Sequence, residues 1–125
     1  MDTGRAGEFL CAYLLEKHFG LEAHHVRTTE DDLWCRSAGG VVIRVQVKSA
    51  NLADKNRYEY FTGSRRGADV YAFVALGADL MLLKDSNFVG ERKRININKK
   101  KFTLHNMITT GNEVIAAYNL PESGG

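Results

Sequence analysis

The alternating stretch "IRVQVKSA", residues 43–50, constrains the fold of this chain more than any other feature. Every second position near its start is apolar: Ile43, Val45 and Val47. Side chains of a β-strand point alternately to opposite faces, so the pattern predicts a strand with one buried face. The polar residues between them must then share the other face, either exposed to solvent or as part of a site: Arg44, Gln46 and Lys48.

A short segment upstream is expected to pair with this strand. The segment "DLWC", residues 32–35, indicates a strand, and Ser37–Gly40 form a turn before "VVIRVQVKSA" returns antiparallel to it. Asp32 then lies opposite Val45 or Gln46, because the sequence does not fix the register to one residue. In both registers its carboxylate lies close to the polar face of the longer strand.

The N-terminal stretch predicts a helix packed inside the domain. Thr3 or Gly4 can cap a helix from about Arg5 to Phe19, and Gly20 can end it. This segment is apolar on most sides, which makes Glu8 conspicuous. At helical spacing Glu8 shares a face with three residues of low polarity: Cys11, Ala12 and Leu15.

The remainder of the chain indicates more strands and one more helix. Polar residues 51–67, with interleaved Tyr58, Tyr60 and Phe61, indicate a loop or an irregular hairpin whose aromatic side chains stack on bases or anchor in the core. Strands are expected at three segments: "DVYAFVAL" (69–76), "LMLLK" (80–84) and "KRININ" (93–98). The first two are almost wholly apolar, which predicts central positions covered on both faces.

A second helix is expected over Asn112–Asn119, or over a longer stretch starting near Thr103. Together these elements predict an α/β domain with a mixed β-sheet flanked by helices, spanning residues 1–120, followed by a disordered tail at 121–125. The 44% hydrophobic and 26% charged content suits one globular domain. No apolar run approaches the roughly 20 residues of a membrane helix, and the N-terminus lacks a signal-sequence pattern, so a cytoplasmic, non-membrane protein is expected.

The cysteines and the charges narrow the chemistry. Cys11 and Cys35 fall in the expected helix and strand, which favours buried, reduced thiols over a disulfide, and the cysteines and histidines offer no zinc-site spacing. The net charge is only +2, but Lys and Arg cluster in ways that suit phosphate contact or a solvated face. The candidate DNA-contacting residues are Arg5, Ser49, Arg57, Arg65, Arg66, Arg92, Lys93, Arg94, Lys99, Lys100 and Lys101. Ser49 equally well ends the strand.

Four polar residues could converge at one sheet edge: Glu8, Asp32, Gln46 and Lys48. Two carboxylates, an amide oxygen and a backbone carbonyl such as that of Val47 are hard oxygen ligands suited to Mg²⁺. Lys48 could orient or deprotonate a water beside a phosphodiester. Structural readings stay open for each residue: an acid in a first helical turn is favoured by the helix dipole, Asp32 could pair with Arg27 or Arg44, and Asp31 competes with Asp32.

In this order, "GRAGEFLCAYLLEK", "DLWC" and "VQVKSA" resemble the PD-(D/E)xK nuclease superfamily over about residues 4–50. The resemblance is closest to the branch of cyanobacterial group I intron homing endonucleases, in which glutamine replaces the second acid, and the plan is similar to that of archaeal Holliday junction resolvases. It implies a restriction-endonuclease-like core in which Glu8 is the helix acid, Asp32 the metal-binding aspartate, Gln46 the substituted acid and Lys48 the catalytic lysine. Asp31 stands where the family pattern often has proline.

The resemblance implies a Mg²⁺-dependent DNA endonuclease, with Mn²⁺ as a substitute ion, that acts on DNA as a homodimer or higher homo-oligomer. Homing is the first expectation, with a phage or mobile element as the source, and junction-resolving, restriction or repair roles remain open. The substituted Gln46 also leaves open a catalytically inactive DNA-binding module on the same scaffold. An RNA-processing or tRNA-related enzyme is a third alternative.

Overall fold

The computed structural model describes residues 3–26, 32–63 and 68–119. The expected tail at 121–125 therefore lies outside the described residues. In chain order the elements are α1 (Thr3–Phe19), β1 (Glu22–His25), β2 (Leu33–Arg36), β3 (Val42–Ala50), β4 (Arg57–Phe61), β5 (Val70–Ala75), β6 (Leu80–Asp85), α2 (Ser86–Val89), β7 (Arg94–Asn98), the 3₁₀ helix η1 (Lys99–Lys101) and α3 (Leu104–Asn119).

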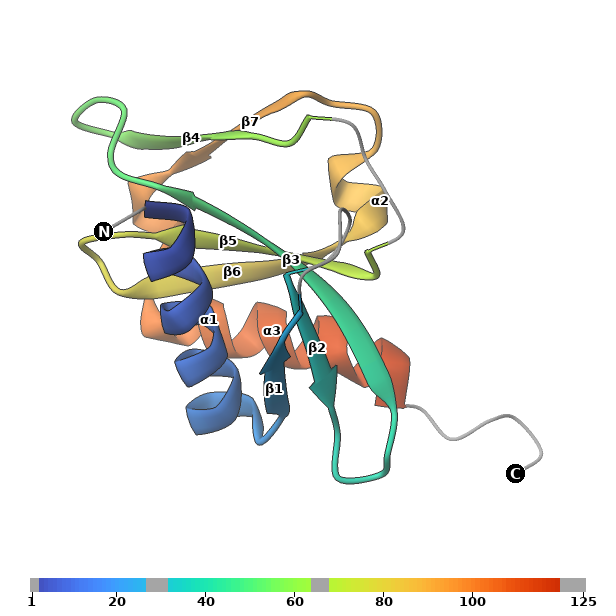
Figure 1. The fold of residues 1–125 in the computed structure, drawn as a ribbon. Helices are drawn as coiled ribbons and strands as arrows, with labels where there is room; N and C mark the ends of the chain where they lie inside the picture. The colour runs from blue at the N-terminus through green and yellow to red at the C-terminus, as the bar shows by residue number, and fades with distance from the viewer. Residues whose placement is uncertain (1–2, 27–31, 64–67, 120–125) are drawn as a thin grey trace.

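Five strands form the main sheet, in the order β1-β2-β3-β5-β6. Strands β3 and β5 are parallel and the other neighbours are antiparallel, so the sheet is mixed. Strands β4 and β7 form a separate two-stranded antiparallel sheet. Figure 1 shows α3 on one side of β5 and β6 and the β4–β7 sheet on the other. The expectation of a mixed α/β fold flanked by helices is confirmed.

Two hydrophobic clusters fill the space on either side of the main sheet. The first packs the sheet against α1 and α3, and its fully buried members include Leu15, Leu33 and Met107. The second lies between β5, β6 and the small sheet and is rich in aromatic rings. There the Tyr60 ring meets Phe73 edge-on at 5.0 Å, and its hydroxyl donates to the Val74 carbonyl at 3.0 Å. The small sheet, together with Val89 of α2, thus covers β5 and β6 on the side opposite α1 and α3.

Helix α1 begins and ends close to its expected bounds, and Gly20 follows it at φ 64°, a left-handed conformation that glycine adopts without strain. Cys11 and Leu15 face the core at 0% and 1% exposure. The helix is not buried all round, however. Phe9 and Tyr13 are 50% and 55% exposed, so the expectation of a helix apolar and buried on most sides was wrong for this face.

Several elements differ from the sequence-based expectation. Strand β1 pairs with β2 although its "EAHH" sequence has no strand pattern, and β4 forms within the segment expected to be a loop or irregular hairpin. Within β4, Tyr58 and Tyr60 are buried core residues, whereas Phe61 is 61% exposed. Strand β6 is buried on both faces but stands at the end of the sheet, so its expected central position was wrong. The longer of the two expected ranges holds for α3.

Both cysteines are free and buried, as expected. Burial raises the pKa of the Cys35 thiol to about 12, with a further contribution from the charge of Glu16. The described helices include none that is both long enough and apolar enough to cross a membrane.

Candidate active site

The β2–β3 hairpin fixes the position of Asp32. Leu33 lies opposite Val45 in the first pair of the β2–β3 ladder, and Asp32 immediately precedes this pair. The Asp32 backbone N–H donates to the Val45 carbonyl at 3.0 Å. Its carboxylate Oδ2 accepts a hydrogen bond from the Val47 N–H at 2.8 Å. Just before β2 begins at Leu33, the Asp32 side chain thus takes the place of a backbone partner for the Val47 N–H of β3.

Alternation along β3 holds as expected, with buried residues at every second position from Ile43 to Val47 and half-buried polar residues between them. Gln46 and Lys48 therefore share one face of β3. The Gln46 Oε1 atom is buried and accepts no hydrogen bond in the described part of the chain. Lys48 has no acidic partner within 4.0 Å among the described residues. Gln46 and Lys48 are thus the residues on either side of Val47, whose N–H binds the Asp32 carboxylate.

Helix α1 approaches the same part of β3 from the opposite face. A Cβ on Gly7 would lie 1.6 Å from Ser49 Oγ and 3.8 Å from Val47 Cγ1, so only glycine permits this contact. Glu8, the next residue, is half-buried beside it. Ser49 lies within β3 rather than ending it, and its hydroxyl is buried against the helix. The close contact at Gly7 brings the helix acid to the strand that carries Gln46 and Lys48.

The buried thiol of Cys11 lies near both Glu8 and Asp32. Its pKa is raised first by burial and then by the charges of Cys35, Asp32 and Glu8. Carboxylates from α1 and from the start of β2 therefore both act on the same sulfur atom, although they are 24 positions apart in the sequence. Glu8 and Asp32 therefore lie in one neighbourhood, around Cys11.

The backbone of β3 adds one more oxygen on this edge. In a strand, the N–H and C=O groups of one residue point to the same side, and those of the next residue point to the other. Since the Val47 N–H points to Asp32, the Val47 carbonyl lies on the same edge. No group of three or more His, Cys, Asp or Glu side chains suited to a metal occurs within the described ranges.

The candidate DNA-contacting cations divide into three kinds. Arg57 forms ion pairs with Asp54 at 2.9 Å and Glu59 at 3.2 Å, and Arg94 reaches Glu59 at 3.6 Å. Others lie over aromatic rings: Arg5 over Phe9 and Arg92 over Phe88. The exposed lysines are Lys93, Lys99, Lys100 and Lys101. Asp31, Arg65 and Arg66 lie outside the described residues.

The sequence did not predict two contacts near the site, one at Gly7 and one between Asp69 and Arg44. Gly7 precedes Glu8 in "GRAGE", and a small residue beside a helix acid was the only signal for the close contact. Asp69 accepts three hydrogen bonds from Arg44. Its Oδ2 accepts from the backbone N–H at 2.9 Å and from Nε at 3.3 Å, and its Oδ1 accepts from Nη2 at 3.1 Å. Arg44 is therefore fixed on the polar face of β3, two residues from Gln46.

Comparison with known proteins gives one informative similarity. No family model matches the sequence, and no curated protein matches it. The fold is similar to that in "The structure of a bacterial homing endonuclease: I-Ssp6803I", with a TM-score of 0.65 over 92% of this chain and 95% of that chain. The chain shares the fold of a homing endonuclease. The two sequences are 15% identical, so the similarity extends to the fold alone.

Proposed function

We propose that this chain is a metal-dependent DNA endonuclease of the homing-endonuclease type, within the PD-(D/E)xK superfamily, that hydrolyses phosphodiester bonds. One observation carries the proposal. The Asp32 carboxylate accepts a hydrogen bond from the Val47 N–H of β3, between Gln46 and Lys48, in a chain that shares the fold of a bacterial homing endonuclease. An aspartate, an amide and a lysine at one strand edge combine oxygen ligands with a cation beside them.

The donor set fits a hard divalent cation such as Mg²⁺, with Mn²⁺ as a substitute. Asp32 Oδ1 and the Val47 carbonyl are oxygen donors on one edge, and Gln46 Oε1 is a buried acceptor without a hydrogen bond from a described residue. A buried acceptor of this kind is costly unless something binds it, which favours a ligand here. Glu8 would supply a second carboxylate from α1. When bound, the ion would stabilise negative charge that develops on the phosphate oxygens.

The remaining groups of the chain hold the substrate and manage its charge. The Lys48 ammonium would donate hydrogen bonds to a phosphate oxygen or orient the attacking water. The exposed lysines of η1 and Lys93 would contact backbone phosphates without reading sequence. Because Arg57 and Arg94 are already paired with acids, we expect them to contribute less to DNA affinity than these lysines.

Cutting both strands of a duplex needs two active sites, and one chain carries one. We therefore propose a homodimer or a higher homo-oligomer, with a two-fold axis that relates two active sites. Analytical ultracentrifugation with and without DNA tests this part of the proposal, and a strict monomer on cut duplex DNA would contradict it.

The deciding experiment incubates the protein with plasmid, a four-way junction and single-stranded DNA, each with Mg²⁺, with Mn²⁺ and with a chelator. Asp32→Asn removes the charge while its amide oxygen can still accept from the Val47 N–H, so the fold is retained. We expect this variant to lose cleavage by on the order of 100-fold or more while it still binds DNA. Lys48→Met should behave in the same way.

Matched controls separate the site from a general charge effect. Asp79→Asn removes an exposed acid in the β5–β6 turn, where φ is 58° and asparagine is well tolerated. Lys84→Met removes a half-buried strand lysine on β6. Both controls should cleave like the wild type. A wild-type protein that binds DNA but cuts none of these substrates with either ion would identify an inactive DNA-binding module instead.

A further inference from the structure

The small sheet has an outer face that takes no part in the hydrophobic core. Residues of β4 and β7 alternate between the two faces, and those that pack on the central strands are Tyr58, Tyr60, Ile95 and Ile97. The outer face carries three cross-strand pairs: Arg57 with Asn98, Glu59 with Asn96, and Phe61 with Arg94. This face therefore combines hydrogen-bonding side chains with one aromatic ring, which is 61% exposed.

The small sheet lies on the same side of the main sheet as the candidate active site. Gln46 and Lys48 of β3 pair with Tyr71 and Phe73 of the parallel strand β5. Paired residues of neighbouring strands direct their side chains to the same face of a sheet. Tyr71 and Phe73 belong to the aromatic cluster beneath the small sheet, whereas α3 covers the other side (Figure 1). A duplex bound at Gln46 and Lys48 therefore lies on the side of the small sheet, away from α3.

The side chains of the outer face are of the types that read base edges in duplex DNA. The major groove is about 12 Å wide and admits a two-stranded β-ribbon. In that groove arginine donates to guanine, asparagine both donates to and accepts from adenine, glutamate accepts from cytosine, and an apolar ring contacts the thymine methyl group. All four residue types occur together on the outer face of β4 and β7.

The dimensions of β7 fit a short stretch of this groove. The strand has five residues from Arg94 to Asn98 and spans about 13 Å, which is about four base-pair steps of roughly 3.4 Å. Exposed lysines lie beyond both ends: Lys93 before the strand and Lys99, Lys100 and Lys101 after it. Ammonium groups suit contact with backbone phosphates, which position a protein on the duplex without reading its sequence. The small sheet therefore has phosphate-binding groups at its ends and base-reading groups between them.

In the free protein the polar groups of the outer face bind one another. Arg57 Nη1 donates to Glu59 Oε2 at 3.2 Å and to Asn96 Oδ1, and Arg94 Nε lies 3.6 Å from Glu59 Oε2. The Arg94 guanidinium also lies over the Phe61 ring, 5.1 Å from its centroid. A matching base edge replaces these hydrogen bonds, whereas a mismatched base leaves the groups unpaired. The outer face therefore contributes more to the choice of sequence than to affinity.

We propose that the outer face of the small sheet enters the major groove of duplex DNA and reads the bases of the target site. The inference rests on the proposed nuclease function and adds a surface that selects the substrate, separate from the residues that cleave it. Arg94 and Asn96 are its central specificity-determining residues, since both are exposed on one face of β7. They stand two residues apart, about 7 Å, so they read base pairs about two steps apart.

Selection from a library of duplexes with a randomised central segment tests the proposal. The protein is mixed with the library in chelator, which prevents cleavage, and the bound duplexes are sequenced. We expect the duplexes bound by the wild type to share a base preference. Asn96→Ala should lose this preference at one base pair, and Arg94→Ala should lose it at a second base pair about two steps away.

Anisotropy with the selected duplex and its single-base-pair variants gives the magnitude. Changing the base pair that Asn96 reads should weaken binding by the wild type about 5- to 150-fold, and should not change binding by Asn96→Ala. Asn112→Ala, which removes an exposed asparagine from α3, is the matched control and should keep the wild-type preference.

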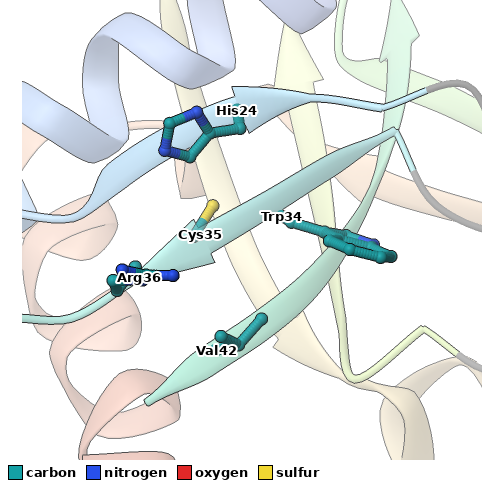
Figure 2. A pocket seen from close by; sticks show the side chains of 5 residues that line it. All are labelled: His24, Trp34, Cys35, Arg36 and Val42. Carbon is teal, nitrogen blue, oxygen red and sulfur yellow. The ribbon is translucent and has the colours of Figure 1, made fainter. Parts of the chain in front are cut away.

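Arg36→Ala is the matched control for Arg94→Ala. Figure 2 shows Arg36 at the end of β2, where it lines a shallow pocket of about 100 Å³. Strand β3 separates β2 from the strands that the small sheet covers, so this variant should also keep the base preference.

The salt dependence of binding separates base reading from phosphate contact. Lys100→Met should lower the slope of log affinity against log salt concentration by about 0.9 and should keep the base preference. Asn96→Ala should keep the slope and lose the preference at its base pair. Circular dichroism confirms that each variant is folded.

Two results would overturn the inference. The first is a set of duplexes selected by the wild type that share no base preference. The second is an unchanged preference in folded Asn96→Ala and Arg94→Ala proteins. Failure of the proposed function has a different signature: a protein that selects a base preference in chelator, yet cleaves the selected duplex with neither Mg²⁺ nor Mn²⁺, keeps the reading surface and loses the nuclease assignment.

Discussion

Replacing Gly7 by alanine tests whether α1 must touch β3 as closely as the structure shows. Within an exposed helix the change should stabilise the protein by about 1 kcal/mol, because alanine is the better helix former. Here the new Cβ would lie 1.6 Å from Ser49 Oγ and 2.7 Å from Ser49 Cβ. The Oγ contact can be relieved by rotation of the side chain, but the Cβ contact cannot, because the backbone of β3 fixes that atom.

Restoring an ordinary carbon–carbon contact of about 3.5 to 4 Å requires α1 to move away from β3 by about 1 Å. Overpacking of this kind costs about 1 to 3 kcal/mol, and the gain in helix propensity offsets about 1 kcal/mol of it. We therefore expect Gly7→Ala to be destabilised by about 1 to 2 kcal/mol. Urea unfolding followed by circular dichroism measures the difference. The same displacement moves Glu8, so cleavage should fall by up to about 100-fold under conditions where the variant is folded.

A double-mutant cycle with Ser49→Gly supplies the control. Removing the Ser49 side chain takes away both close atoms, so Gly7→Ala should cost less in the Ser49→Gly background. The expected coupling is about 1 kcal/mol or more. If Gly7→Ala instead stabilises the protein by about 1 kcal/mol, helix propensity alone governs the position and the close approach of α1 to β3 is refuted.

Three further predictions address the metal site, the core and the pH dependence. Gln46→Glu adds a third acid to the donor set, so calorimetry should show tighter Mg²⁺ binding in the free protein. The gain in Mg²⁺ affinity when DNA is added should be smaller than in the wild type. Equal Mg²⁺ affinity in variant and wild type would argue against Gln46 as a ligand. Tyr60→Phe removes the hydrogen bond to the Val74 carbonyl and should cost about 1 to 3 kcal/mol in urea unfolding, whereas a neutral effect would indicate that water replaces the hydroxyl. The pKa of the Cys35 thiol is raised from 9.0 to about 12 in the folded protein, so the unfolded chain loses this proton at a lower pH. The free energy of unfolding should therefore fall by about 1.4 kcal/mol per pH unit for this thiol as the pH rises from 9 towards 12. The Cys35→Ser variant should show a shallower decline with pH, and an equal slope would contradict the assignment.

The hairpin of the candidate site was predictable because its signals are local. The two-residue alternation of β3 and the turn at Ser37–Gly40 determined the strand, its buried face and the pairing with β2. Only the choice between two registers needed coordinates, since sliding by one residue leaves the same turn sequence plausible. In the structure the Asp32 backbone N–H bonds to the Val45 carbonyl, immediately before the first regular pair, Leu33 with Val45.

The second sheet could not be predicted, because its stability depends on contacts distant in sequence. Strand β4 lies in a polar segment, and its pairing with β7 joins residues about 40 positions apart. Only the burial of Tyr58 and Tyr60 against the central strands gives the segment a reason to be a strand. The partners of Arg57, in contrast, are local: Asp54 and Glu59 lie three and two positions away in the sequence, so the compensating acids were visible beside the arginine.

The candidate site lies where the backbone pairing of β3 with β2 ends and the Asp32 side chain takes over as hydrogen-bond partner. In a continuous ladder the Val47 N–H would bond to a carbonyl of a neighbouring strand, but here Asp32 Oδ2 takes that role. This bond holds the carboxylate in a fixed orientation and leaves Oδ1 available to a cation. In the proposed site Glu8 comes from a separate element, because one strand end anchors one carboxylate in this way and a second acid would approach over the face of β3. Gly7 permits that approach, so the loss of a single methyl-sized space should separate the two acids without breaking the hairpin.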